Sequence, residues 1–537
     1  MKRRKIYEIY LVVLVAIIAT TGCNKFGDMN EDPSQSTNMD PNMQLSAIQL
    51  QVSGNKWEQD RLFIYAGAFV YHVSGSWAIG EYGGKGKKEN SYMSILWSSD
   101  YPVQIKNIVD LVERTKDKPE LKNLNAVGRI MKVYLFSRLT DMYGDIPYFD
   151  AGMGYYTGKF LPKYDKQEDI YNDFFKELTE ATATLDPNGD NILYDIYYNG
   201  DIARWKKFAN SLHLRLAMHL TKVAPERARV EAEAAIAAGV MENNSDLCMT
   251  RHLNSPFDGN DWGTGGNGNS YIFMESGINA NNIRVSSEYV KLLENMNDPR
   301  LPVMAGCYLE DQARTDITQA LLTELGVKWQ DIAVPASNFT WDIWRAPITL
   351  TVNGNEYKDI EGRLQQLQPS KYLCAYDAPY FHLSFAEVRF LMAEAAFRGW
   401  NAGGETVAQL YAEGLEAAVK QVTLYPNAPE INQGKITAFV SANPLTAGSE
   451  LEQINTQLWA NLYLNEIEAY TNLRRSGYPA FAWKDPVPAE SQSNHLMPRR
   501  YEYPLNEQFK NLDNYNEAVQ RMGGTDNWTN RVWWDKQ

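Results

Sequence analysis

The sequence predicts a mainly α-helical fold in which tetratricopeptide-like helix pairs support a large, irregular, loop-rich portion with a few short strands. Apolar residues recur at helical spacing in two regions, near 124–240 and near 384–476. Helix pairs with short connections stack, because each pair buries the face of the next. The tracts near 53–103 and 241–379 are rich in Gly, Asn and aromatic residues and are too long for simple connections. Within the second tract, Asn353-Gly354 lies between short alternating runs and predicts a β-hairpin.

The chain begins with a predicted signal peptide, residues 1–22. Four basic residues within the first five precede an apolar run from Ile9 to Thr20. A membrane-spanning helix needs about 20 apolar residues, whereas the apolar part of a signal peptide needs about 7–15 after a basic start. The run is too short for a spanning helix, so we interpret it as an export signal.

Cys23 stands where this apolar run ends. Residues Ala19–Cys23 resemble the lipobox of bacterial lipoproteins, in which signal peptidase cuts before a cysteine that then carries fatty chains. Several acyl chains, at about 0.8 kcal/mol per buried CH₂, would hold the protein on a membrane. We therefore predict lipidation at Cys23, a lipidated tether over 23–40 and one folded domain over 41–537. An ordinary signal peptide followed by a chance cysteine is the alternative.

Charge and cysteine usage argue against several classes of protein. The net charge is −14, and it becomes −17 when residues 1–22 leave with four basic residues and one acid. Nucleic-acid binding depends on Lys and Arg that neutralise phosphates, so we expect no nucleic-acid partner. Cys248, Cys307 and Cys374 are then odd in number, widely spaced and without a CxxC motif. They predict buried free thiols rather than a disulfide framework or a zinc site.

Three helical faces are predicted in the first paired region. Apolar residues repeat at i, i+3, i+4 and i+7 over Val127–Met142 and again over Ile170–Leu185. The third face covers Trp205–Leu220, and the Ala-rich segment after it can end at Gly239. These faces predict helices that pack pairwise.

The second paired region opens at Ser384. Ser384 and Glu387 have the spacing of a capping box, in which each side chain satisfies a backbone N–H of the first turn. The helix that follows pairs with a face over Val407–Val422. The last apolar face, Leu451–Tyr470, predicts one continuous helix that ends at Gly477.

Several segments are similar to a known family. AVGRIMKVYLFSRLTDMYGDIPYFDA (126–151) resembles the helix and following YGDIP motif of the SusD/RagB family, the outer-membrane nutrient-binding lipoproteins of Gram-negative glycan-utilisation systems. Tyr143, Gly144, Pro147 and Arg500 belong to matched segments, and we interpret them as structural, with Gly144 ending its helix at φ > 0. Further matches follow in the family's order along nearly the whole mature chain: NEDPSQST, QEDIYNDFFKELTEATATLD, DIARWKKFANSLHLRLAMHL, LSFAEVRFLMAEAAFRG, QLWANLYLNEIEAYTNLRRSGYP, MPRRYEYPLNEQ and RVWWDK.

The resemblance implies a fold, a cargo and a partner. The fold is four tetratricopeptide-like helix pairs that support an irregular ligand-binding portion, which makes residues 41–537 one SusD-like domain. The cargo is an oligosaccharide, bound at the cell surface and delivered to a TonB-dependent (SusC-like) transporter in the outer membrane. Oligopeptides are the nearer alternative, because the family carries both cargoes. The expected location is the outer membrane, held by the N-terminal lipid and facing the cell exterior.

Motifs for cofactor and metal chemistry are weak. Gly263–Gly268 satisfies G-x-G-x-x-G, but it has no strand before it and no helix after it, so a loop is the better interpretation. His213 and His219 are six residues apart, off a single helical face, which argues against a shared metal. We therefore expect no cofactor and no metal site. Three oxygen donors leave calcium open as an alternative: Asp258, Asn260 and Asp261.

A lipoprotein glycoside hydrolase is a further alternative, since such an enzyme would also be acidic, aromatic-rich and exported. Its chemistry needs two facing carboxylates. Glu387 and Glu394 are seven residues apart on one helix face, which aims both in the same direction. The capping role of Glu387 favours a structural interpretation, so we predict no catalytic residue and no enzyme.

Aromatic residues in the irregular tracts are the candidate ligand contacts. Sugars present apolar C–H faces and hydroxyl edges, so a site needs flat rings with amide or carboxylate groups beside them. The 14 Trp and 32 Tyr exceed what packing suggests, and those on helices, such as Trp205 and Trp459, are expected in the core. For each loop aromatic, half-buried packing stays open as the alternative. The predicted ligand contacts are Trp77, Tyr82, Trp97, Trp262, Asn267, Trp341 and Trp344.

Overall fold

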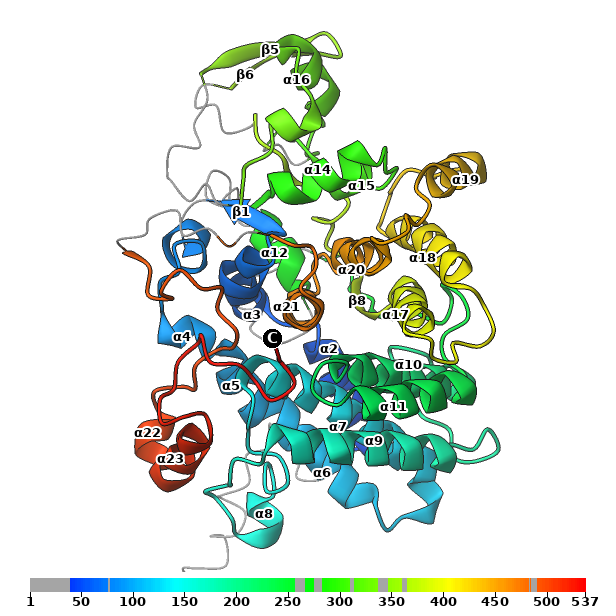
Figure 1. Cartoon of the computed structure of the whole chain (residues 1–537), viewed down its shortest axis with the longest axis vertical. Coiled ribbons are helices and arrows are strands. Elements are labelled where there is room, and N and C mark those ends of the chain that lie inside the picture. Colours follow the sequence, from blue (N-terminus) through cyan, green and yellow to red (C-terminus); the bar gives the residue numbers. More distant parts are fainter. Residues whose placement is uncertain are drawn as a thin grey trace, which may run out of the picture.

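The computed structural model of the chain is mainly helical with a few short strands, which confirms the predicted fold class (Figure 1). The structure describes residues 39–75, 78–255, 266–274, 283–309, 313–336, 346–359, 365–481, 483 and 490–537. Within these ranges, no helix is both long enough and apolar enough to span a bilayer. The predicted signal peptide and Cys23 lie outside the described residues.

The first paired region forms a stack of helices at the lower right of Figure 1. Its elements are α2 (Pro41–Gln51), α6 (Lys106–Thr115), the short η5 (Pro119–Leu121), α7 (Lys122–Tyr143), α9 (Gln167–Thr184), α10 (Ile202–His219) and α11 (Pro225–Ala238). Neighbours along the chain pack together, α7 on α9, α9 on α10 and α10 on α11. All three predicted faces therefore form helices here. Gly144, at φ 86°, and Gly239, at φ 95°, end α7 and α11 as predicted.

The second paired region continues this stack. Its elements are α17 (Phe385–Phe397), α18 (Val407–Val422), α19 (Gln433–Ala442), α20 (Glu450–Asn461) and α21 (Glu466–Ser476). The last predicted face is two helices and not one. The chain turns at Leu464, which has φ 74°, and the backbone N–H of Leu464 donates to the side chain of Glu466 at 3.2 Å. The apolar spacing on either side of this turn stays in phase, which is why periodicity alone merged the two helices.

The start of α17 corrects the predicted capping box in one respect. Ser384 caps the helix, since its hydroxyl accepts from the backbone N–H of Glu387 at 3.2 Å. The Glu387 side chain does not reach back, because it forms an ion pair with Arg215 of α10 instead. A single side-chain cap therefore opens the helix.

The irregular portion is built from short elements. The strands form four antiparallel pairs: β1 (Val73–Gly75) with β3 (Ile283–Val285), β2 (Cys248–Thr250) with β8 (Tyr380–Leu383), β4 (Ala305–Gly306) with β7 (Gln368–Pro369), and β5 (Ile348–Val352) with β6 (Asn355–Asp359). Asn353 and Gly354, at φ 51° and 81°, join β5 to β6 and confirm the predicted hairpin, which lies at the top of Figure 1. The helical pieces are α3 (Lys56–Leu62), η2 (Phe63–Gly67), η3 (Ile79–Gly83), α4 (Asn90–Met93), α5 (Ile95–Ser99), η4 (Asp100–Ile105), α8 (Gly154–Thr157), α12 (Gly268–Met274), α14 (Ser287–Asn295), α15 (Leu301–Met304), α16 (Thr318–Leu325), η6 (Trp329–Asp331), α22 (Glu507–Lys510) and α23 (Leu512–Arg521).

Buried groups in the core agree with several structural predictions. Trp205 and Trp459 are 0% and 1% exposed, and Arg500 is fully buried, with its Nε donating to the Tyr143 carbonyl at 3.0 Å. These residues therefore hold helices together rather than face a ligand. The three cysteines are buried free thiols, as predicted: Cys248, Cys307 and Cys374.

Candidate ligand-binding site

A row of four aromatic rings and two cations lies where α3, α4, η3 and α12 meet. Every member is half-buried, and each contacts the next through ring packing or a cation–π contact. We call this row the aromatic ladder. In order along the row, its members are Tyr82, Tyr92, Arg61, Trp57, Lys56 and Tyr271.

Arg61 joins the first half of the ladder. Trp57 and Arg61 lie one turn apart on α3, so both project from the same face of that helix. The guanidinium carbon of Arg61 is 4.2 Å from the ring centroid of Tyr92 and 4.9 Å from that of Trp57. The Tyr92 ring in turn packs edge-on against Tyr82, with centroids 5.3 Å apart. Cation–π contacts of this kind fix the orientation of half-exposed rings.

Lys56 joins the second half. Its Nζ is 4.8 Å from the ring centroid of Trp57 and 4.2 Å from that of Tyr271, and it donates to the Tyr271 hydroxyl at 2.8 Å. Asn55 fixes where α3 begins, because its side chain accepts from the backbone N–H of Trp57 at 2.9 Å. The helix start therefore positions both Lys56 and Trp57.

Two glycines let the ladder's elements approach one another. A Cβ at Gly268 would lie 2.7 Å from the Gly54 carbonyl oxygen and 2.8 Å from the Asn55 carbonyl carbon, so only glycine lets α12 begin against α3. A Cβ at Gly83 would lie 1.8 Å from the Ile64 carbonyl oxygen, so glycine is also required where η3 lies on η2. These close contacts bring Tyr271 and Tyr82 to the two ends of the row.

A buried acidic pair lies behind the ladder. Glu58 follows Trp57 on α3 and accepts from the Arg138 guanidinium at 3.0 Å, and Asp100 is the second carboxylate near that arginine. Burial, and then the negative charge of Asp100, raise the pKa of Glu58 to about 8. Burial also raises the pKa of Asp100 to about 6. Since one guanidinium serves two carboxyl groups, the pair retains a proton near neutral pH.

Comparison with known proteins identifies the family. Residues 33–504 match the model of the SusD-like proteins, described as "starch-binding associating with outer membrane". The chain belongs to the SusD-like family. No curated protein matches this SusD-like chain.

Solved structures resemble the SusD-like chain over most of its length. One, a chitin-binding protein, is 38% identical with a TM-score of 0.78 and matches over 93% of this chain and 100% of its own. A second, the Bacteroidetes AC2a SusD-like protein, is 31% identical with a TM-score of 0.83 and also matches over 93% of this chain and 100% of its own. A chitin-binding SusD homologue from Flavobacterium johnsoniae, at 22% identity and a TM-score of 0.71 over 93% of this chain and 99% of its own, shares the fold.

The predicted ligand contacts have different surroundings in the SusD-like structure. Tyr82 lies in the ladder. Asn267 is buried, its side-chain oxygen accepts from the Ser270 N–H at 3.1 Å and its amide donates to the Ala378 carbonyl at 2.9 Å, an arrangement typical of a helix cap. Trp97, on α5, is 8% exposed and packs against four tyrosine rings: Tyr101, Tyr143, Tyr164 and Tyr503. The remaining predicted contacts, Trp77, Trp262, Trp341 and Trp344, lie outside the described residues, as do the oxygen donors Asp258, Asn260 and Asp261.

Sequence reasoning missed most of the ladder. Trp57 was assigned no role, and Tyr92, Tyr271 and the two cations were not singled out. A signal was present in KWEQDRL (56–62), where Trp57 and Leu62 are the only apolar residues. A tryptophan on so polar a helix has no apolar stripe to join, which indicates a surface role.

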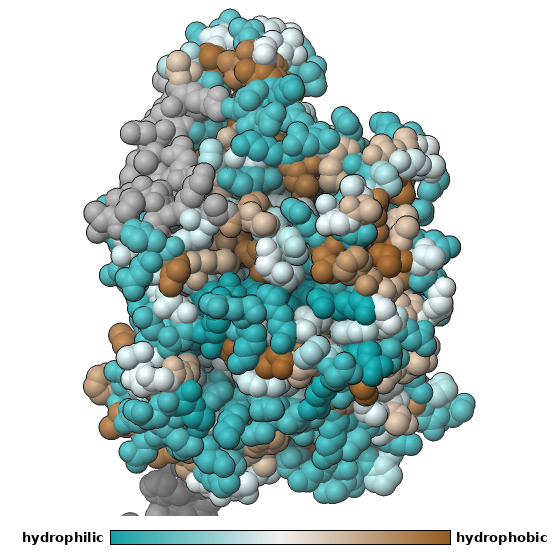
Figure 2. Space-filling model, in the orientation of Figure 1, coloured by the Kyte–Doolittle hydropathy of each residue, from teal (hydrophilic) through white to brown (hydrophobic). Residues whose placement is uncertain are grey.

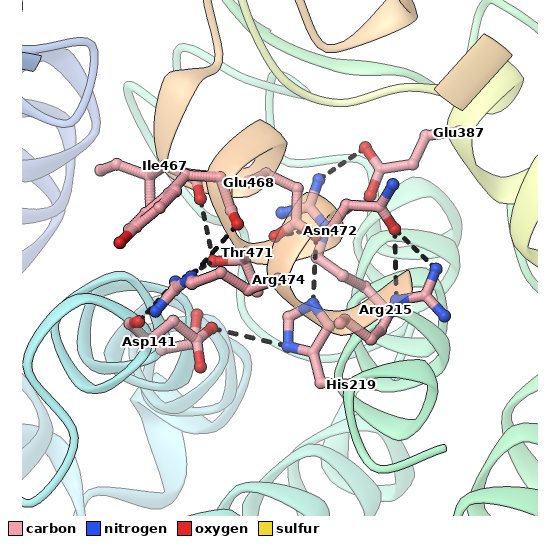
Figure 3. Close-up of polar contacts among 12 residues, drawn as sticks. Asp141, Arg215, His219, Glu387, Ile467, Glu468, Thr471, Asn472 and Arg474 are labelled. Carbon is pink, nitrogen blue, oxygen red and sulfur yellow. Dashed lines mark hydrogen bonds and ion pairs between the residues drawn. The ribbon is translucent and has the colours of Figure 1, made fainter. Parts of the chain in front are cut away.

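The two carboxylates considered for catalysis are buried and paired. Figure 3 shows Glu387 beside Arg215, whose Nε and Nη2 donate to it at 2.5 and 2.7 Å. Glu394 accepts from the two terminal nitrogens of Arg475 at 2.8 and 2.9 Å. The partners come from different helices, α10 and α21, so each carboxylate is directed into its own helix contact. This geometry gives both residues a structural role.

His213 and His219 also have separate partners. His213 contacts Glu231 of α11 at 2.8 Å, whereas His219 lies between Glu468 at 3.0 Å and Asp141 at 3.5 Å (Figure 3). Across the described ranges, no group of three or more His, Cys, Asp or Glu residues is arranged to hold a metal ion. The two histidines therefore link neighbouring helices of the scaffold.

Proposed function

We propose that this SusD-like protein binds oligosaccharides on the aromatic ladder. The observation that supports the proposal is the row itself, in which Arg61 and Lys56 lie between half-buried rings, four rings in all. Aromatic rings stack on the apolar faces of sugar rings, and the N–H donors between them suit hydroxyl and carbonyl oxygens. A row of four rings suits a chain of sugars better than a single one.

Chains of N-acetylglucosamine, as in chitin, are the glycan that we propose first. The solved relative with the higher identity is described as chitin-binding. Each N-acetyl group carries a carbonyl acceptor and a methyl group. The acceptor suits the donors on Lys56 and Arg61, and the methyl group suits the rings beside them.

We further propose that Cys23 carries the lipid anchor, that residues 41–537 act as one domain facing the cell exterior, and that the cargo passes to a SusC-like TonB-dependent transporter. The lipobox resemblance and the family's association with the outer membrane support this arrangement. A Cys23→Ala variant should leave the outer-membrane fraction. Fractionation like that of the wild type would contradict the anchor.

A binding screen tests the cargo. Purified mature protein is titrated calorimetrically with chitooligosaccharides, maltooligosaccharides and an oligopeptide mixture. We expect saturable binding of chitooligosaccharides, recovered intact by chromatography. Binding of peptides alone would establish the alternative cargo, and cleavage that disappears in Glu387→Gln would establish an enzyme.

A further inference from the structure

Helices α8 and α22 lie toward the end of the molecule opposite the β5–β6 hairpin (Figure 1), and exposed apolar side chains belong to these helices and to the residues next to them. Hydrophobic atoms are visible there at the lower left edge of Figure 2, where Figure 1 places α22 and α23. We call this group the basal patch. Its members, with their exposed fractions, are Tyr155 (91%), Phe160 (78%), Leu161 (63%), Leu505 (54%), Phe509 (84%) and Leu512 (49%).

The two segments that carry the basal patch are held side by side. The Asn511 side chain donates to the Pro162 carbonyl at 2.9 Å, and that of Asn514 donates to the Leu161 carbonyl at 3.2 Å. Between the segments lies a hollow of about 810 Å³, to which Trp97 contributes. The patch therefore consists of two protruding tips on either side of a hollow.

A lysine lies next to an exposed aromatic ring on each of the two tips. Lys159 precedes Phe160 on one tip and Lys510 follows Phe509 on the other. With Lys106, they place three lysines around the hollow against two carboxylates, Asp150 and Glu507. The side chains that line the hollow thus carry a net charge of +1, with Lys159 paired to Asp150 at 2.8 Å, in a chain whose net charge is −14.

The patch is close to Met39, the first residue that the structure describes. The Met39 carbonyl accepts from Arg114 at 2.8 Å, Arg114 lies 3.6 Å from Asp110, and Asp110 accepts from the hydroxyl of Tyr156 on α8 at 2.7 Å. Only two side chains therefore separate Met39 from α8. Sixteen residue steps separate Met39 from Cys23, and a chain of that length spans at most roughly 55 Å.

We propose that the basal patch contacts the headgroup region of the lipid surface that carries the N-terminal anchor. The proposal rests on the lipid anchor proposed above. Aromatic tips flanked by lysines suit the boundary between anionic headgroups and acyl chains. Acidic residues more than about 8–10 Å from the basal patch act little on it, because salt screens charges beyond that distance.

The shape of the basal patch favours a lipid surface over a protein partner. A protein interface presents a continuous, complementary face. Here the most exposed rings stand on or beside four-residue helices on two separate tips. Contact through both tips would fix the orientation of the domain, with the β5–β6 hairpin directed away from the membrane (Figure 1).

Lysine reactivity on tethered protein tests the proposal. Mature protein (23–537) is coupled through Cys23 to a maleimide lipid in phosphatidylcholine vesicles that contain phosphatidylglycerol; the other three cysteines are buried. Acetylation rates are measured by mass spectrometry, with uncoupled protein beside the same vesicles as the reference. We expect tethering to slow the acetylation of Lys159 and Lys510 at least about threefold, since both side chains then lie in the headgroup layer. Lys358, on the opposite hairpin, should react at an unchanged rate.

Matched variants distinguish lysine protection that depends on the basal patch from protection that any protein held near the vesicle would show. Phe160→Ser combined with Phe509→Ser should return both lysines to the uncoupled rate, whereas Leu253→Ser, at a residue 81% exposed, should retain the protection. Equal rates in coupled and uncoupled wild type, or protection that survives the double variant, would overturn the proposal. Protection seen only with vesicles that contain outer-membrane proteins would assign the patch to a protein partner. Because the coupling is chemical, failure of Cys23 lipidation in cells would be detected separately.

Discussion

Two buried glutamates have opposite environments, Glu394 in the helix-pair scaffold and Glu58 beneath the aromatic ladder. Glu394 accepts from Arg475 at 2.8 and 2.9 Å, from Arg398 at 2.8 Å and from Asn455 at 3.1 Å. Burial acts to raise its pKa, but the two guanidinium groups outweigh burial and lower the pKa to about 2. The partners of Glu394 thus compensate its buried charge fully.

The buried charge of Glu58 is compensated far less than that of Glu394. Its ion-pair partner, Arg138, also neutralises Asp100, and within the described chain neither Arg138 Nη1 nor Asp100 Oδ2 has a hydrogen-bond partner. Burial and the Asp100 charge therefore raise the pKa of Glu58 to about 8. Perturbed carboxyl groups cluster at functional sites, where stability is not the only constraint. The difference shows that its partners hold Glu394 in the charged form, whereas Glu58, beneath the ladder, retains a proton to higher pH.

Breaking the Arg475–Glu394 ion pair of the scaffold should have the largest effect on the free energy of unfolding. Arg475→Ala leaves Glu394 buried without its main partner, which should lower the free energy of unfolding by about 3–5 kcal/mol. Urea unfolding followed by circular dichroism measures this loss. Arg229→Ala, which removes exposed pairs with Glu226 and Glu233, is the control and should leave the free energy of unfolding nearly unchanged. Equal effects in the two variants would contradict the comparison.

Acid should remove the stabilisation from Glu394. Its pKa is about 2 in the folded chain against 4.5 ordinarily, so its contribution is present above pH 4.5 and is lost as the pH falls toward 2. The loss should be about 3 kcal/mol between pH 5 and pH 2, which Glu394→Gln should not show. Unfolding measured in urea at several pH values compares the two proteins. Parallel curves for wild type and variant would exclude this role.

Glu58 should respond to pH in the opposite direction. A folded pKa near 8 means that the folded chain binds more protons than the unfolded chain between pH 4.5 and 8, so stability falls as the pH rises. Asp100 shares the proton, and we expect a loss on the order of 2 kcal/mol from pH 5 to pH 8. Glu58→Gln keeps a hydrogen-bond acceptor for Arg138 and should flatten this dependence. Equal stability of the wild type at pH 8 and at pH 5 would contradict the prediction.

The scaffold could be predicted from the sequence because its signals are local. Apolar spacing located α7, α9, α10 and α18, the capping pattern at Ser384 located α17, and Asn353-Gly354 located a hairpin, since each signal depends on residues a few positions apart. The same method merged α20 and α21, because the turn at Leu464 has neither a glycine nor a proline to mark it.

The ladder could not be predicted in this way, because its contacts are non-local. Lys56 and Tyr271, which share a hydrogen bond, are 215 residues apart. Nothing within a short window distinguishes Tyr271 from Trp97, an aromatic residue on a short helix of the same irregular portion that packs in a buried tyrosine stack. Only the folded chain distinguishes a half-buried ladder ring from a fully packed residue.

Calorimetry on Trp57→Ala tests the central claim, that the aromatic ladder is the glycan-binding surface. Trp400→Ala is the matched control, since Trp400 is also half-buried, with the Arg398 guanidinium 5.9 Å from its ring centroid. If the Trp57 ring contributes about 1–2 kcal/mol, its loss should weaken chitooligosaccharide binding roughly 5- to 30-fold while helicity stays unchanged. Trp400→Ala should bind as the wild type does. Unchanged affinity in Trp57→Ala, or equal losses in both variants, would contradict the claim.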